Sequence, residues 1–159
     1  MAWFLLLSFN LFSQTSLREK YMGVHYKDVE EINELKKISS SVINLHYGVT
    51  HVKLDDNKQV LFVSKFENSL NLHDDYQLRI VDVIEIPRFN ENYYCVSLKG
   101  CSDNGKSDPT IFALAKKDYD KYLTTIVKVW KLDKSRGKLI DYPKLGVKCL
   151  NQQGFVMND

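Results

Sequence analysis

The sequence predicts a single α+β domain built on a twisted antiparallel sheet of about six or seven strands. Three observations lead to this fold class: the chain length, one long alternating segment and one segment with helical spacing. At 159 residues the chain suits one domain that buries about two thirds of its unfolded surface. Its hydrophobic fraction of 44% and charged fraction of 26% are close to those of soluble globular proteins. Strong twist would let such a sheet close partly on itself.

The alternating segment covers residues 76–87, and we expect it in the middle of the sheet. One face of this segment is apolar and holds Tyr76, Leu78, Ile80, Ile84 and Ile86. Period-two spacing with β-branched residues is typical of a strand that has one face on a core. Shorter strands are predicted on both sides, at residues 49–54, 59–66, 93–99, 110–116, 127–132 and 138–142.

Residues 28–43 carry the helical spacing and predict the one long helix. Its apolar side chains recur at three- and four-residue intervals: Val29, Ile32, Leu35, Ile38 and Val42. Asp28, with Glu31 three residues later, is close to a capping box. We expect the apolar stripe to pack on one face of the sheet. A second, short helix is predicted over residues 118–125, with Asp118 as its cap.

The first thirteen residues predict a secretory signal peptide, which leaves residues 14–159 as the mature domain. Residues 3–12 read WFLLLSFNLF, about half the roughly twenty residues that a membrane-spanning helix needs. Small and polar residues follow, and cleavage after Ser13 would make Gln14 the new first residue. No Lys or Arg precedes the run. The alternative is a buried N-terminal strand or helix of a cytosolic protein; we favour export to the periplasm or the medium.

Three cysteines allow at most one intramolecular disulfide in an exported chain. Cys95 lies inside a strand candidate, whereas Cys101 and Cys149 lie at or near loop ends. We therefore expect a Cys101–Cys149 bond that ties the C-terminal segment back to the sheet. Cys95 would then be a small buried hydrophobe. A Cys-x-x-Cys pair, the usual mark of a zinc site, is absent from the sequence.

Asp82 interrupts the apolar face of residues 76–87 and is the candidate buried acid. A carboxylate in a core is costly unless it is paired, and Arg79 or Arg88 could be its partner. In a cleft such a group could act as a general acid. The competing interpretation, which we favour, is a β-bulge at residues 81–83 that turns Asp82 outward.

Aromatic residues supply the second candidate site. An exposed patch of Phe89, Tyr93, Tyr94 and Trp130 could contact a sugar or a protein partner, although such residues more often pack within a sheet.

Side chains that can bind metal have no metal-site spacing, and no cofactor is expected. Asp103-Asn104-Gly105 lacks the later Glu of a calcium loop and fits a hairpin turn better. His46 and His51 are expected on the surface beside strands. The net charge of +2 is spread along the chain, which gives no reason to expect a nucleic-acid partner.

Two C-terminal segments carry a recognisable pattern of turns and strands. They are GCSDNGKSDPTIFALAKK at residues 100–117 and VKVWKLDKSRGKLIDYPKLGVKCLN at residues 127–151. With their Cys-x-x-Asn-Gly turn and Gly-Val-x-Cys-x-Asn close, residues 78–151 resemble small exported proteins of Bacteroidetes of uncharacterised function. The apolar start that ends in Phe12-Ser13-Gln14 is similar to signal peptides of that phylum. The resemblance implies export and a Cys101–Cys149 pairing, and it implies no activity.

These observations together predict a non-enzymatic exported binding module that acts on a protein or an envelope component. An inhibitor or immunity-type protein belongs to this class. Two alternatives remain open: a small hydrolase that uses Asp82 or another carboxylate in a cleft, and a purely structural envelope domain. After removal of the signal peptide, no membrane span is expected.

Overall fold

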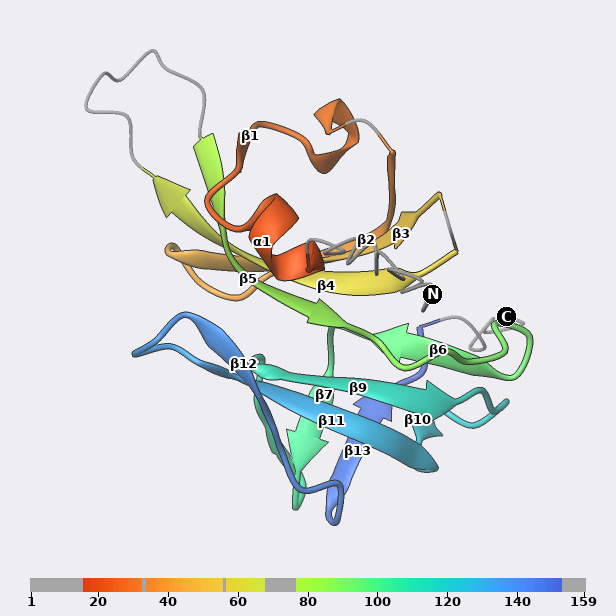
Figure 1. Ribbon diagram of the computed structural model, residues 1–159. Coiled ribbons are helices and arrows are strands. Elements are labelled where there is room, and N and C mark those ends of the chain that lie inside the picture. Colours follow the sequence, from red (N-terminus) through yellow and green to blue (C-terminus); the bar gives the residue numbers. More distant parts are fainter. Residues whose placement is uncertain (1–15, 33, 56, 68–76, 153–159) are drawn as a thin grey trace, which may run out of the picture.

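The chain forms three antiparallel sheets stacked in layers, rather than one sheet covered by helices (Figure 1). The structure is a computed structural model that describes residues 16–32, 34–55, 57–67 and 77–152. Within these ranges the helices are the single turns α1 (Leu17–Tyr21) and η1 (Val29–Glu31). The α+β prediction is therefore wrong, because the protein is nearly all β. No helix of the described part is long and apolar enough to cross a membrane.

Sheet A is formed by the N-terminal half of the chain. Its strands, in spatial order, are β1 (His25–Tyr26), β5 (Gln77–Glu85), β4 (Gln59–Glu67), β3 (Tyr47–Leu54) and β2 (Leu35–Val42). The predicted alternating strand is β5, but β4 takes the central place. The predicted hairpin of residues 49–54 and 59–66 is confirmed as β3 and β4.

Sheets B and C are formed by the C-terminal half. Sheet B has the order β12 (Lys138–Asp141), β11 (Ile126–Asp133), β9 (Ile111–Lys116) and β6 (Tyr94–Ser97). Sheet C has the order β10 (Tyr122–Leu123), β13 (Val147–Leu150), β7 (Cys101–Asp103) and β8 (Lys106–Ser107).

The layers are α1, sheet A, sheet B and sheet C, and a core lies between each pair (Figure 1). Strand β9 shows how the middle layer is covered on both faces. Phe112 and Leu114 face the core shared with sheet A, while Ile111, Ala113 and Ala115 face the core shared with sheet C. All five are buried, so β9 is a continuous apolar run.

The long helix predicted over residues 28–43 is replaced by η1 and strand β2. Asp28 does cap a helical turn, because its side chain accepts a hydrogen bond from the Glu30 amide. Glu34 then adopts a left-handed φ of 73°, and the chain continues as a strand paired with β3. Residues 38–43 are mostly Ser, Val and Ile, which are weak helix formers, and pairing with β3 decides their structure. Ile38 and Val42 are exposed.

The short helix predicted over residues 118–125 is also absent. Tyr122 and Leu123 form strand β10, which pairs with Leu150 and Cys149 of β13. Predicted turns fare better: Asn104-Gly105 joins β7 to β8 with both residues at positive φ, and residues 133–137 join β11 to β12.

Candidate functional site

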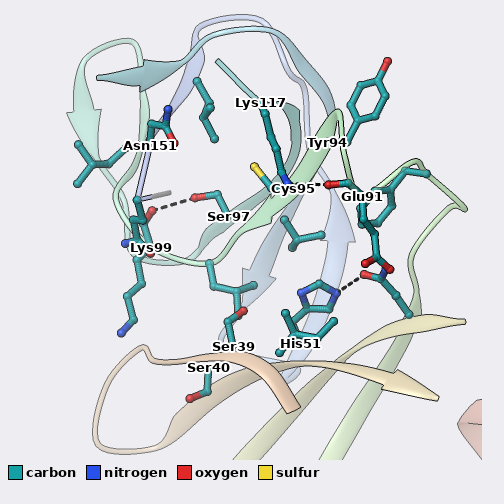
Figure 2. Close-up of a pocket in the computed structure, with 18 residues that line it drawn as sticks. Ser39, Ser40, His51, Glu91, Tyr94, Cys95, Ser97, Lys99, Lys117 and Asn151 are labelled. Carbon is teal, nitrogen blue, oxygen red and sulfur yellow. Dashed lines mark hydrogen bonds between the residues drawn. The ribbon is translucent and has the colours of Figure 1, made fainter. Parts of the chain in front are cut away.

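A cavity of about 340 Å³ runs along the free edge of β6, the last strand of sheet B (Figure 2). Six consecutive residues, 94–99, line it. Sheet A supplies one wall through β2 and β3, and sheet C supplies the other through Leu123 of β10 and residues 150–152. The volume lies near the lower end of the range for small-molecule sites. We take this cavity as the candidate site because residues of all three sheets line it.

His51 of β3 points from sheet A toward β6 and is 3% exposed (Figure 2). A chain of hydrogen bonds holds its imidazole. Gln59 donates its side-chain N–H to Glu91 Oε1 at 2.7 Å, so its Oε1 is left to accept from His51 Nε2 at 2.6 Å. Lys53 Nζ also donates to Glu91 Oε1, at 2.9 Å. The proton of a neutral His51 is therefore on Nε2, and Nδ1 is the lone-pair acceptor.

His51 Nδ1 has no hydrogen-bond partner among the described residues. Burial lowers the pKa of His51, although the Gln59 hydrogen bond opposes this effect. The imidazole is thus neutral near neutral pH. A side chain that is otherwise buried thus presents one open acceptor to the cavity.

Two lysines give the cavity a positive charge. Lys99 and Lys117 line it, and neither forms an ion pair with a carboxylate of the described residues. Lys117 Nζ donates to the backbone carbonyl of Glu91 at 2.6 Å. The Glu91 carboxylate is already matched by Lys53, whose hydrogen bond holds the pKa of Glu91 below its usual value. The site therefore favours an anionic ligand.

A neighbouring hollow of about 450 Å³ shares Gln59, Phe89 and Glu91 with this cavity. Side chains of both charge signs line it, among them Lys53, Lys58, Glu85 and Arg88. Glu91 therefore lines both hollows.

The predicted aromatic patch is not assembled. Trp130 is 1% exposed and packs between sheets A and B, whereas Tyr93 is 62% exposed. Phe89 and Tyr94 are half-buried and line the β6 cavity. Two of the four residues therefore belong to the candidate site, as parts of its wall.

Asp82 is buried rather than turned outward. The predicted bulge is present. Val63 pairs with Asp82 and the next residue, Ser64, pairs with Ile80, so Val81 has no partner on β4. It directs Asp82 into the interior, where Oδ2 accepts a hydrogen bond from the Leu139 amide at 2.9 Å. The charge partner is Arg18 of α1, with Nη2 2.9 Å from Oδ1, and neither predicted arginine takes this place. Asp82 lines neither hollow.

The cysteine prediction is confirmed in both parts. Cys101 and Cys149 form a disulfide between neighbouring strands of sheet C, and Cys95 is free and buried. Burial raises the pKa of the Cys95 thiol, which keeps it protonated. Among the described residues, no cluster of His, Cys, Asp and Glu could hold a metal ion.

Sequence reasoning placed His51 on the surface and so missed the centre of the site; His46 is exposed as expected. One signal for the burial of His51 was present in the sequence. His51 lies between Val49 and Lys53 on one face of a predicted strand, and the apolar Val52 lies on the other face.

Comparison of the chain with protein-family models, curated proteins and solved structures finds no match.

Proposed function

We propose that this protein is a non-enzymatic binding protein of an oxidising, exported compartment, and that it holds its ligand in the β6 cavity. The observation that carries the proposal is the open Nδ1 of buried His51. This nitrogen lies open to the cavity and can accept a hydrogen bond from a ligand N–H or O–H. The ligand would carry an anionic group toward Lys99 or Lys117 and apolar groups toward Ile38, Phe89 and Leu98.

Two further observations support this function over its alternatives. The Cys101–Cys149 disulfide favours an oxidising compartment, in line with a signal peptide in residues 1–13, which lie outside the described residues. A hydrolase that uses Asp82 would need this carboxylate to reach a substrate. Asp82 instead contacts Arg18 and the Leu139 amide.

The test measures binding at His51 directly, by ¹⁵N NMR of the imidazole nitrogens in the full chain. The probes are N-acetylglycine and lactate, each of which combines a hydrogen-bond donor with a carboxylate. We expect a saturable shift of Nδ1 at millimolar probe in the wild type and in the matched variant His46→Phe. Titration calorimetry, which does not depend on the imidazole signal, should show that His51→Phe has lost this binding. The proposal fails if neither these acids nor peptides that carry the same two groups bind in a manner that depends on His51.

A further inference from the structure

We propose that the ligand of the β6 cavity is an extended acidic peptide, which adds to the free edge of β6 as a further strand of sheet B. This inference rests on the proposed function, because it names the class of ligand that the cavity holds. Strand addition to an exposed sheet edge is a general mode of peptide recognition.

On the side of β6 away from β9, the Tyr94 amide donates to the Asn90 carbonyl, whereas the Val96 backbone groups are unpaired among the described residues. The Lys117 amide donates to the Tyr93 carbonyl, which makes Tyr94 and Lys116 a pair without mutual hydrogen bonds. Two residues on, Val96 stands in the same relation to Leu114, so its N–H and C=O point away from β9. Within the described ranges, no other strand pairs with this edge of β6.

The shape of the cavity matches an occupant along this edge. Side chains of a strand alternate between its two faces, so a ligand on one face would touch every second residue. The cavity instead touches each of residues 94–99 in turn. Side chains of an added strand would therefore point alternately toward His51 of sheet A and toward Leu123 of sheet C.

The edge of β6 also lacks the features that usually prevent strand addition. Edge strands are commonly protected by lysines, prolines or bulges. Strand β2, at the edge of sheet A, has Lys36, Lys37 and a register shift before Ser39. Strand β6 reads Tyr-Cys-Val-Ser and pairs with β9 without a register shift.

Charge complementarity sets the class of peptide. Lys117 lies at the Tyr94 end of β6 and Lys99 lies beyond its Ser97 end. An extended peptide of about six residues, at roughly 3.3 Å per residue, would cover the strand and reach both lysines. Acidic residues near both ends of the peptide would then meet a cation.

The probe is a synthetic library of acetylated, amidated hexapeptides with Asp or Glu at both ends and mixed residues at the four central positions. We expect the full chain to select members that shift His51 Nδ1. In the free protein the Val96 amide should exchange with solvent quickly, and bound peptide should protect it. Methylating the peptide backbone nitrogens one at a time should weaken binding about tenfold or more at every second position.

A matched pair of variants tests the same edge from the protein side. Val96→Pro removes an N–H that β9 does not use, so the ladder of sheet B is kept. Val96→Thr keeps that backbone N–H and replaces the side chain with one of the same shape. We expect the selected peptide to bind Val96→Thr like wild type and to bind Val96→Pro about tenfold or more weakly.

Each remaining outcome overturns the inference in a distinguishable way. If the library gives no binder while N-acetylglycine or lactate shifts His51, strand addition fails and the proposed function stands. If neither shifts His51, both fail. Peptide binding that tolerates methylation at every position also contradicts strand addition. A Val96 amide that is protected before any peptide is added shows that the edge is already paired, by a second copy or by the chain itself.

Discussion

The two faces of sheet B are joined to their neighbours by different means. Toward sheet A the side chains are large, and they include Phe112, Trp130 and Leu132. Toward sheet C no aromatic side chain of the described residues is buried: Ala113 and Ala115 lie beside Ile111, Ile126 and Val129, and all three cysteines lie in this core. The two interfaces thus differ in how much apolar surface each residue can bury.

A second stabilising element lies on each side of sheet B. Against sheet A, Asp82 of β5 accepts the Leu139 amide of β12 and so joins the two sheets by a charged hydrogen bond. On the other side, the Cys101–Cys149 bond joins the neighbouring strands β7 and β13 and so reinforces sheet C itself rather than its contact with sheet B. The comparison teaches that a polar contact joins sheet A to sheet B, whereas sheet C is held together by a covalent bond within the sheet and meets sheet B through apolar packing.

Removing the largest side chain should test the first interface most severely. Trp130→Ala should lower the free energy of unfolding by about 5 kcal/mol, at the upper end for aromatic truncations, because Trp130 is 1% exposed. Urea unfolding measures the loss. Tyr119→Ala, at a side chain that is 93% exposed, is the control and should change stability by less than about 0.5 kcal/mol. A loss at Trp130 as small as that of the control would contradict the layered core.

Removing the disulfide should have the next largest effect. For a sequence separation of 48 residues, loop entropy gives a loss of about 4 kcal/mol in the double variant Cys101→Ser with Cys149→Ser. Reductant should lower the stability of the wild type to that of the double variant and leave the double variant unchanged. Cys95→Ala, which keeps the disulfide, should remain sensitive to reductant.

Asp82→Ala should cost about 3 kcal/mol, because it leaves the buried Leu139 amide without its charged acceptor. Arg18 is partly exposed and can turn to solvent, so it adds little to the loss. Asp82→Asn keeps an acceptor oxygen and should cost less than half as much. Equal losses in the two variants would show that charge, rather than the hydrogen bond between sheets, is what matters at this position.

The smallest effect concerns Asp108, at the interface with sheet C, where its amide donates to the Cys101 carbonyl. Burial alone would raise the pKa of Asp108. Hydrogen bonds from Thr110 and Lys131 outweigh burial and lower this pKa from 3.8 to about 2. Because the pKa of Asp108 is lower in the folded than in the unfolded state, its ionised carboxylate stabilises the fold at every pH above the unfolded pKa of 3.8. This stabilisation is lost as the pH falls from 3.8 to about 2. The expected loss is about 2 kcal/mol.

Acid titration of stability measures this loss. The matched variant Asp108→Asn should lack that part of the pH dependence, because its side chain does not titrate. An unchanged acid profile in Asp108→Asn would assign the loss to other carboxylates.

Local chemistry explains what could be predicted from the sequence. The Asn104-Gly105 turn and the 133–137 turn depend on residues within a few positions, so both turns were predicted correctly, although strands β7 and β8 lie in a segment that was expected to be a turn. The apolar spacing of residues 28–43 was real, but whether β3 would pair with them depended on distant residues.

The rest depends on contacts between layers. Asp82 meets Arg18 of α1 and the Leu139 amide of β12, both far away in sequence. Trp130 lies on a strand of the layer that is covered on both faces, which no single strand pattern indicates. His51 gains its role only when β6 is placed above it. The site was therefore beyond prediction, although Phe89 and Tyr94 were singled out for their aromatic side chains.

The three cysteines also impose an order of events on the maturation of the chain. Synthesis from the N-terminus makes Cys95 and Cys101 available close together, while Cys149 follows 48 residues behind Cys101. The first bond available to an oxidant is thus the incorrect Cys95–Cys101 pair, and exchange must later pass the bond to Cys149. Oxidative refolding of Cys95→Ala should lack this transient species, which acid trapping and mass spectrometry would detect in wild type. In that exchange the Cys149 thiolate attacks the Cys101 sulfur and Cys95 leaves as the free thiol of β6, so the native pairing is reached without a further oxidant.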